Sequence, residues 1–189
     1  MGPLFVVLLH PLRTDLDRGK DATLTSHRPS NVDDGEIFRG IVDVMLKLSR
    51  EPPVIWPVHP RSRKMLERLD LTSGIERNRG FRLIPPIGYL DMLILNRSAR
   101  MIMTDSGGLQ EEATVLGVPC ITLRENTERP VTVKAGANVV VGNRPGAIRS
   151  AVSSVMNEIG RRLIRIPQRW DGMASARIVD VLLHSRFWS

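Results

Sequence analysis

Cysteine is nearly absent from this sequence of 189 residues, in which Cys120 is the single one. A lone cysteine excludes a disulfide framework within the chain and a cysteine-rich zinc site. The four histidines are scattered, and no spacing of His, Cys, Asp or Glu typical of a metal site occurs. We therefore expect no metal site, and we expect the protein in a reducing compartment, the cytoplasm.

Aromatic residues make up only 4% of the chain, and no run of Lys and Arg reaches five residues. Nucleic-acid-binding proteins often use stacked aromatic side chains or basic tails, so we expect no nucleic acid as a partner. Long apolar runs are missing too. The stretch from Leu4 to Leu9 has six residues, whereas a membrane-spanning helix needs about 20. No basic region precedes it, as a signal peptide would require. We expect a buried strand or a loosely held terminus there, and no membrane partner.

What the chain does have is a balanced composition, 42% hydrophobic and 25% charged, with 27 Lys and Arg against 20 Asp and Glu. Such a composition is typical of an ordinary globular domain with a sizeable core. The net charge of +7 predicts an anionic partner: a nucleic acid, a membrane surface or a phosphorylated small molecule. Charge alone does not choose among these three.

Short apolar runs alternate with helical patterns from residue 22 onwards. Strands are predicted over residues 22–25, 54–58, 81–84, 101–104, 120–123 and 139–141. Helices are predicted over residues 37–48 (behind Asp33 and Asp34), 61–69, 88–96, 109–116, 145–159 and 174–183. Helices between successive strands imply parallel strands with right-handed crossovers. The sequence therefore predicts an α/β fold, a doubly wound, Rossmann-like parallel sheet over residues 22–189, preceded by an N-terminal segment or linker remnant over residues 1–21.

Ligands of such sheets lie beyond the carboxyl ends of the strands, and one loop there carries a glycine turn, Asp105-Ser106-Gly107-Gly108. Glycines let the backbone approach a ligand, and the first amides of the following helix favour phosphate oxygens. A tight turn capped by Ser106 or Asp105 is the alternative interpretation. Glu111 and Glu112 follow, expected in the first helical turn. A carboxylate there stabilises the helix end, or accepts hydrogen bonds from ribose hydroxyls.

Three more loops at the same edge carry His or Arg. His27 and Arg28 follow the first strand, His59 follows the second, and residues 124–130 follow the strand after the glycine turn. Imidazole exchanges protons near neutral pH, and guanidinium groups bind phosphate with two parallel hydrogen bonds. Taken alone, His27 and Arg28 are more typical of an ordinary surface loop than of a site, and Thr127 is equally compatible with the N-cap of a helix that has Pro130 in its first turn. Convergence of the arginines predicts an anion as large as a diphosphate.

The motifs resemble those of the UDP-N-acetylglucosamine 2-epimerase family, specifically its carboxyl-terminal domain, from about Ala22 to Leu183. The resemblance rests on the following residues, in the family's order: Thr25, His27, Arg28 and Asn31; His59 and Pro60; Tyr89 and Leu90; residues 105–112 with the pattern Asp-Ser-Gly-Gly-x-Gln-Glu-Glu; Thr127 to Pro130; and Gly136 with Val141 and Gly142. Several ordered motifs over most of the chain are far more specific than one glycine turn.

The resemblance implies one half of a glycosyltransferase-B-like enzyme whose substrate lies between two Rossmann-like halves. It implies that Ser106, Gly107 and Gly108 hold the diphosphate and that Glu112 holds the ribose hydroxyls. The loop from Ile87 to Met92 would hold the uracil. His27 would be the catalytic histidine of this half, with Arg28 and Arg129 as anion-binding residues.

The reaction implied is the interconversion of UDP-N-acetylglucosamine and UDP-N-acetylmannosamine. UDP is eliminated from C1 as the C2 proton leaves, and then adds back. The resemblance therefore implies that no metal and no other cofactor is required. Ser30 and Val131 depart from acidic positions of the family. The carboxylates of the family's amino-terminal domain are not in this sequence, so we expect a partner that supplies them, an amino-terminal domain on another chain, and self-association is a further expectation. The alternatives are an inactive UDP-sugar-binding or regulatory module, a hydrolysing epimerase and a glycosyltransferase.

Overall fold

The structure is a computed structural model that describes residues 19–50, 52–160 and 163–184. Its centre is a sheet of six parallel strands in the order β3-β2-β1-β4-β5-β6. The strands are β1 (Ala22–Thr25), β2 (Val54–Pro57), β3 (Phe81–Ile84), β4 (Met101–Thr104), β5 (Cys120–Thr122) and β6 (Asn138–Val140). This order is that of the doubly wound, Rossmann-like fold, and the predicted fold class is confirmed. The expected strand at Leu4–Leu9, and residues 1–18 of the expected linker, lie outside the described residues.

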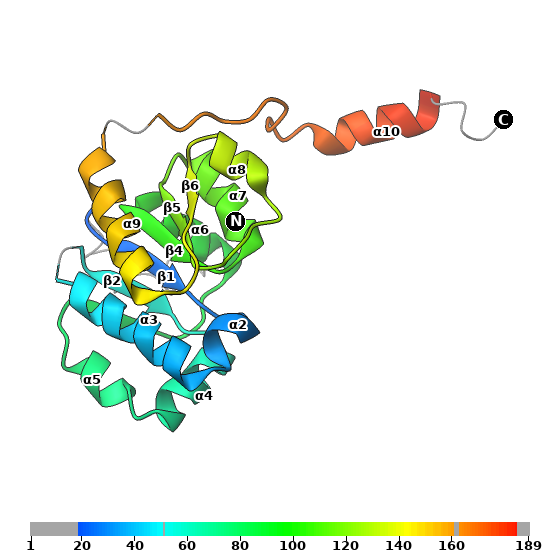
Figure 1. Ribbon diagram of the computed structural model, residues 1–189. Coiled ribbons are helices and arrows are strands. Elements are labelled where there is room, and N and C mark those ends of the chain that lie inside the picture. Colours follow the sequence, from blue (N-terminus) through cyan, green and yellow to red (C-terminus); the bar gives the residue numbers. More distant parts are fainter. Residues whose placement is uncertain (1–18, 51, 161–162, 185–189) are drawn as a thin grey trace, which may run out of the picture.

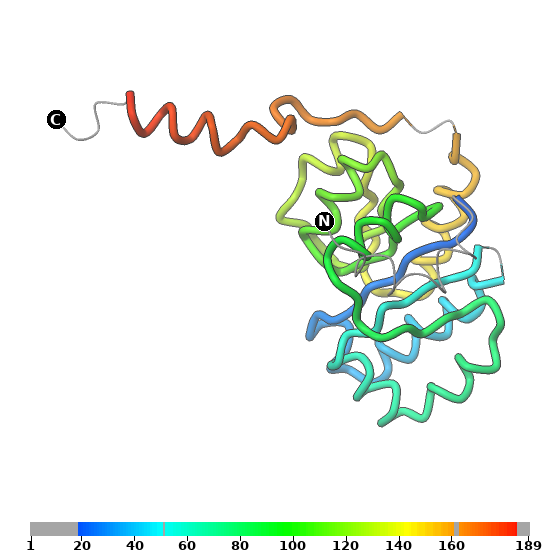
Figure 2. The backbone as a smooth tube through the Cα atoms, turned by 180° about the vertical axis from the view of Figure 1, so that it is seen from behind, coloured from blue at the N-terminus to red at the C-terminus, as the bar shows by residue number. Residues whose placement is uncertain are grey.

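Helices cover both faces of this sheet (Figure 1). They are α2 (Pro29–Val32), α3 (Gly35–Leu48), α4 (Pro60–Arg68), α5 (Thr72–Glu76), α6 (Tyr89–Ser98), α7 (Gly107–Leu116), α8 (Pro130–Lys134), α9 (Pro145–Glu158) and α10 (Ala174–His184). On one face α3 packs beside α9, and α6 and α7 pack together on the other, which Figure 2 shows from behind. The long predicted helices are confirmed. The short helices α2 and α5 were not predicted, because four or five residues are too few to show a helical period. Helix α8 was predicted only as one of two interpretations, as a helix with Pro130 in its first turn.

Alternating side chains explain why both faces of the sheet are covered. In β4, Met101 and Met103 belong to the large apolar core under α3 and α9, whereas Ile102 belongs to a smaller cluster with Ala113 of α7 and Cys120. All five side chains are buried. Successive strand residues point to opposite faces, so a continuous apolar run such as Met-Ile-Met needs apolar cover on both sides.

The helix ends follow local sequence signals. The Asp34 carboxylate accepts hydrogen bonds from the amides of Glu36 and Ile37 at 2.9 and 3.1 Å, which caps α3 as predicted. Helix α7 ends at a glycine signal: Gly117, which follows its last residue, adopts a left-handed conformation with φ of 69°. Asp33, the residue before Asp34, pairs with Arg61.

Helix α10 differs from the others because none of its residues is buried. It extends away from the sheet at the end of a long connection (Figure 1). Ile178, Val181 and Leu182 are each more than half exposed, and their spacing of three and four residues puts them on one side of the helix. This side of α10 is an apolar surface without cover in the described part of the chain.

Candidate functional site

The candidate site lies at the carboxyl ends of β1 and β4, the two central strands. The chain leaves β1 towards β2 and leaves β4 towards β5, so the connections diverge to opposite sides of the sheet. Ligands of doubly wound sheets bind where the connections diverge in this way. The loops that leave the two strands are residues 26–28 and 105–106, and they contain His27, Arg28, Asp105 and Ser106.

Asp105 joins these two loops and is completely buried. Its Oδ2 accepts hydrogen bonds from the amides of His27 and Arg28 at 2.9 and 3.0 Å. The same oxygen accepts from Ser26 Oγ and Asn31 Nδ2, both at 3.1 Å. Burial alone would raise the pKa of Asp105, but the hydrogen bonds from His27 and Arg28 outweigh it and hold the pKa below its usual value. Asp105 is therefore a buried anion that fixes the shape of residues 26–31, which are the loop after β1 and the start of α2 (together the 26–31 loop).

The orientation of the His27 ring follows from the same carboxylate. His27 Nδ1 lies 3.0 Å from Asp105 Oδ1. An ionised carboxylate only accepts hydrogen bonds, so the proton of a neutral His27 belongs on Nδ1 and the lone pair on Nε2. The His59 ring lies next to it, with 5.4 Å between ring centroids. His59 uses its Nδ1 to accept the amide of Arg61 and cap α4.

Helix α7 begins at Gly107, two residues earlier than predicted. Ser106 is its N-cap, but within the described residues the Ser106 side chain makes no capping hydrogen bond. Asp105 does not cap it either, since its carboxylate is turned to the 26–31 loop. The start of α7 is thus a cluster of backbone amides with partial positive charge. A side chain at Gly108 would meet only Ser106 Oγ, at 4.0 Å, so the approach is open there.

Three arginines surround this helix start, and each contacts a carboxylate. Arg28 Nη2 lies 3.3 Å from Glu128 Oε1, and Arg124 Nη1 lies 2.6 Å from Glu128 Oε2. Arg129 Nε lies 3.3 Å from Glu111 Oε2. The helix start and the loops after β1 and β5 therefore bring cationic groups together, as the sequence predicted. Thr127 is not the N-cap of α8. Arg129 holds that place, and Thr127 Oγ1 accepts the Arg129 amide.

Two cavities border α7, one at its start and the other along its second half. One, of about 230 Å³, is lined among others by His27 and His59, which follow β1 and β2, by Met92 of α6, and by Ser106, which precedes α7. Tyr89, in the segment expected to hold a base, is 65% exposed at the start of α6. The other cavity, of about 530 Å³, lies between α6 and α7 and is lined by Glu111, Glu112 and Trp170 together with apolar residues.

Glu111 and Glu112 lie in the second turn of α7, not in the first as expected, because the helix begins earlier. Glu112 Oε2 is buried and has no hydrogen-bond partner among the described residues. Burial raises the pKa of Glu112. A buried acceptor without a partner costs stability unless a ligand donates to it, so Glu112 marks the cavity beside α7 as a place for hydroxyl or amide donors.

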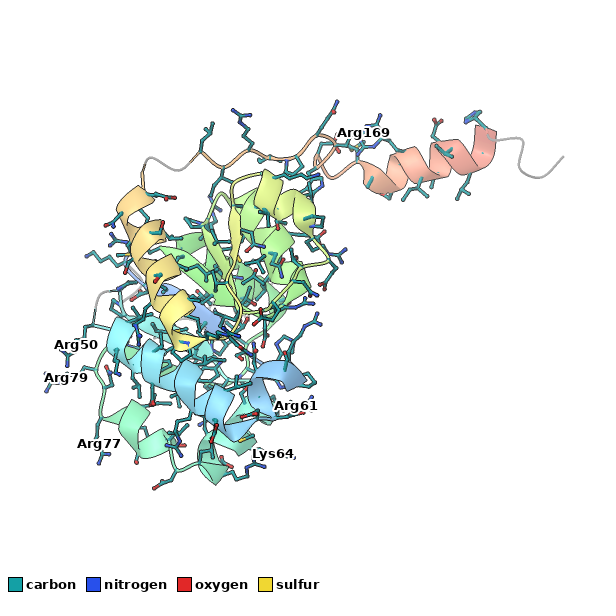
Figure 3. All side chains as sticks on the ribbon, in the orientation of Figure 1. Arg50, Arg61, Lys64, Arg77, Arg79 and Arg169 are labelled. Carbon is teal, nitrogen blue, oxygen red and sulfur yellow. The ribbon has the colours of Figure 1, made fainter. Side chains whose placement is uncertain are left out.

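Not all of the positive charge lies at the carboxyl edge. Arg50, Arg77 and Arg79 precede β2 and β3 at the amino edge of the sheet, where Figure 3 labels them.

In the described part of the chain, no group of three or more His, Cys, Asp and Glu side chains could hold a metal ion. Among residues 19–50, 52–160 and 163–184, no helix is long and apolar enough to cross a membrane.

Sequence reasoning missed how two residues hold the site together. Asp105 was weighed only as a helix cap. Gln110, which was given no role, binds the Ser106 carbonyl at 3.2 Å through Nε2, and its Oε1 accepts from Thr127 at 2.5 Å and Asn138 at 3.1 Å. Two signals were available: both residues belong to the Asp-Ser-Gly-Gly-x-Gln-Glu-Glu pattern, and both are polar, one directly after an apolar strand and the other within a helix. Their partners lie too far along the chain to show a pattern.

The fold and this arrangement define a class, the Rossmann-like domains with a candidate ligand site at the start of a helix that begins with two glycines. A family model described as UDP-N-acetylglucosamine 2-epimerase matches residues 8–183. The chain belongs to this family.

A curated relative, UDP-N-acetylglucosamine 2-epimerase of Methanocaldococcus jannaschii, is 40% identical over 166 residues, which are 87% of this chain and 44% of that protein. A crystal structure of the M. jannaschii UDP-GlcNAc 2-epimerase in complex with UDP-GlcNAc and UDP has a TM-score of 0.79 and 36% identity over 94% of this chain and 48% of that one. An E. coli heptosyltransferase with ADP, 17% identical with a TM-score of 0.54 over 74% of this chain and 45% of that one, shares the fold alone. The chain spans about half the length of the curated relatives it matches, their carboxyl-terminal half.

Proposed function

We propose that this chain is the UDP-binding half of a UDP-N-acetylglucosamine 2-epimerase. The observation that carries the proposal is the uncapped start of α7 among Arg28, Arg124 and Arg129, in a chain whose relative was crystallised with UDP-GlcNAc and UDP. Backbone amides at a helix start together with guanidinium groups are a binding site for a diphosphate.

Different residues bind the different parts of the ligand. The amides of Gly107 and Gly108, with Ser106, hold the diphosphate, and Arg28 and Arg129 offset its charge. Glu112 accepts hydrogen bonds from the ribose hydroxyls, which gives its buried Oε2 the partners it lacks within the described chain. The loop from Ile87 to Met92 holds the uracil. The sugar then extends towards the cavity that His27 and His59 line.

The reaction proceeds by elimination and re-addition. The bond from C1 to the diphosphate oxygen breaks and its electron pair leaves with UDP, while a base removes the C2 proton and a C1–C2 double bond forms. UDP then adds back to C1 and a proton returns to the opposite face of C2. Helix amides and arginines stabilise the charge on departing UDP. His27, whose Nε2 carries the lone pair, is the proton-transfer group of this half.

A second half is needed to complete this active site, and we propose that an amino-terminal domain supplies it. The relatives are about twice as long as this chain. The uncovered apolar side of α10, with Ile178, Val181 and Leu182, is the surface that this domain would cover. The two loops at the candidate site provide no carboxylate for acid–base chemistry at C2, since Asp105 is bound to the 26–31 loop. We place the protein in the cytoplasm, where its buried Cys120 stays reduced.

Proton NMR with this chain and UDP-GlcNAc tests the proposal in one sample. Saturation transfer to the uracil and ribose protons is expected, without new anomeric signals. Addition of the amino-terminal half of a relative should produce the signals of the 2-epimer. Absence of saturation transfer with a folded chain would refute UDP binding. Saturation transfer without signals of the 2-epimer, even with the second half present, would instead show a UDP-sugar-binding module. Self-association through α10 is tested separately, by sedimentation of the chain alone.

A further inference from the structure

A carboxylate of the protein itself lies over the start of α7. Glu128 Oε1 would be only 2.8 Å from a Cβ added at Gly107, so the carboxylate lies against the helix start at the point where this residue has no side chain. The same oxygen contacts Arg28, and the other oxygen contacts Arg124 at 2.6 Å. Glu128 thus meets a helix start and two guanidinium groups, the same groups that a phosphate would use.

The charge and the exposure of Glu128 fit this position. A hydrogen bond from its own backbone amide, together with Arg124 and Arg28, lowers the pKa of Glu128, so the side chain is an anion at neutral pH. The side chain is 44% exposed and belongs to the loop between β5 and α8. Its pair with Arg28, whose side chain is 38% exposed, is a weak surface ion pair, and its pair with Arg124, whose side chain is 14% exposed, is more shielded from water. A more highly charged ligand can therefore displace Glu128 without disturbing the core.

We propose that Glu128 is a specificity-determining residue that competes with ligand phosphates for the start of α7 and for Arg28 and Arg124. The proposal rests on the UDP-binding function proposed above. A ligand must bring enough negative charge to replace the carboxylate on both arginines. A diphosphate carries more charge and more acceptor oxygens than a carboxylate and can do so, whereas a monophosphate gains less and a neutral nucleoside gains nothing.

The direction in which ligand affinity changes when Glu128 is removed distinguishes competition from a supporting role. If Glu128 only ordered the two arginines for a ligand, its removal would weaken binding. If it competes, its removal strengthens binding, because Arg28 and Arg124 no longer exchange one anion for another. Release of the two ion pairs of Glu128 corresponds to an increase in affinity of about tenfold.

Calorimetric titration of the wild-type chain and Glu128→Gln with UDP, UMP and uridine tests the proposal. Gln keeps the shape of the side chain and removes its charge. The affinity of Glu128→Gln for UDP should rise about tenfold, that for UMP should rise less, and that for uridine should stay unchanged. Asp33→Asn is the matched control, since it removes one exposed charge that pairs with Arg61. Its affinities should all stay within about twofold of wild type, because exposed pairs away from the ligand contribute little.

The outcomes separate the two proposals. Weaker or unchanged UDP binding by Glu128→Gln, beside a wild-type chain that binds UDP, overturns the competition and leaves the UDP site standing. Equal gains for uridine and UDP also overturn it, because uridine has no charge to exchange. A folded wild-type chain and a folded Glu128→Gln that both fail to bind UDP refute the UDP site itself, and the competition with it.

Discussion

Replacement of Asp105 by Asn removes the buried charge that joins the loops after β1 and β4. In Asp105→Asn, the amide oxygen can take the place of Oδ2 and still accept from the amides of His27 and Arg28 and from the Ser26 and Asn31 side chains. These four bonds change from charge-assisted to neutral. A bond to a charged group contributes about 1.5–3 kcal/mol and a neutral one about 1 kcal/mol. With some relaxation of the loops, we expect the free energy of unfolding to fall by about 3 kcal/mol.

The assay is urea denaturation at pH 7, followed by fluorescence of Trp56, which is buried and stacked on Phe81. Asp33→Asn, an equal change at an exposed ion pair, should lose less than about 1 kcal/mol. The lowered pKa of Asp105 predicts the pH dependence. Its contribution is complete above the ordinary value of 3.8 and is lost as the pH falls through the lowered value. The difference between wild type and Asp105→Asn should therefore shrink in strong acid.

The same substitution should move a proton on His27. The new amide NH2 group would face Nδ1 and donate to it, so Nδ1 becomes an acceptor and the proton moves to Nε2. Nitrogen-15 chemical shifts of the imidazole report this change directly. A loss of stability no larger than that of Asp33→Asn, or an unchanged tautomer, would refute the assignment of Asp105 as the buried anion that orients His27.

Three further predictions concern α7 and α10. Glu112→Gln should raise the free energy of unfolding at pH 7 by about 0.5 kcal/mol, because burial raises the pKa of Glu112 and its ionisation above the ordinary value of 4.5 costs stability. Denaturant melts should show this gain disappear below pH 4.5, and a gain that persists in acid would contradict the explanation. Gly108→Ala should leave the melt unchanged but lower UDP affinity more than about tenfold in calorimetry, whereas Gly146→Ala, whose Cβ would also meet open space, should affect neither. A chain that ends at residue 173 should unfold within about 0.5 kcal/mol of the full chain, since α10 buries none of its residues. A larger loss in urea melts would mean that α10 packs on the domain.

The strands were predictable because each is a short, mostly apolar run, and in β1, β2, β4 and β5 nearly all of these residues are buried, as in Met101 to Thr104. Their order along the chain then located the ligand edge without any contact being known. Helix starts were less predictable. The helix α7 begins at Gly107 although glycine is a poor helix former, because the first turn has few intrahelical hydrogen bonds to lose.

Contacts between distant residues could not be predicted from the pattern of the sequence. The hydrogen bonds of Asp105 reach residues 74 to 79 positions away, and Glu128 meets Arg28 across 100 positions. Such pairs depend on how two loops meet in space, and a short polar segment looks the same with or without them. The resemblance of motifs suggested which residues share the site, whereas the distances between them came only from the fold.

The bonds of Asp105 also limit how far the glycine turn can be treated as a transferable part. Grafted alone after a strand of another parallel sheet, residues 105–112 would bring a buried carboxylate whose partners, Ser26, His27, Arg28 and Asn31, stayed behind. An unpartnered buried charge of this kind strongly destabilises a protein. The functional module is therefore discontinuous in the chain, two segments that must be transplanted together, and substitutions within them should combine non-additively.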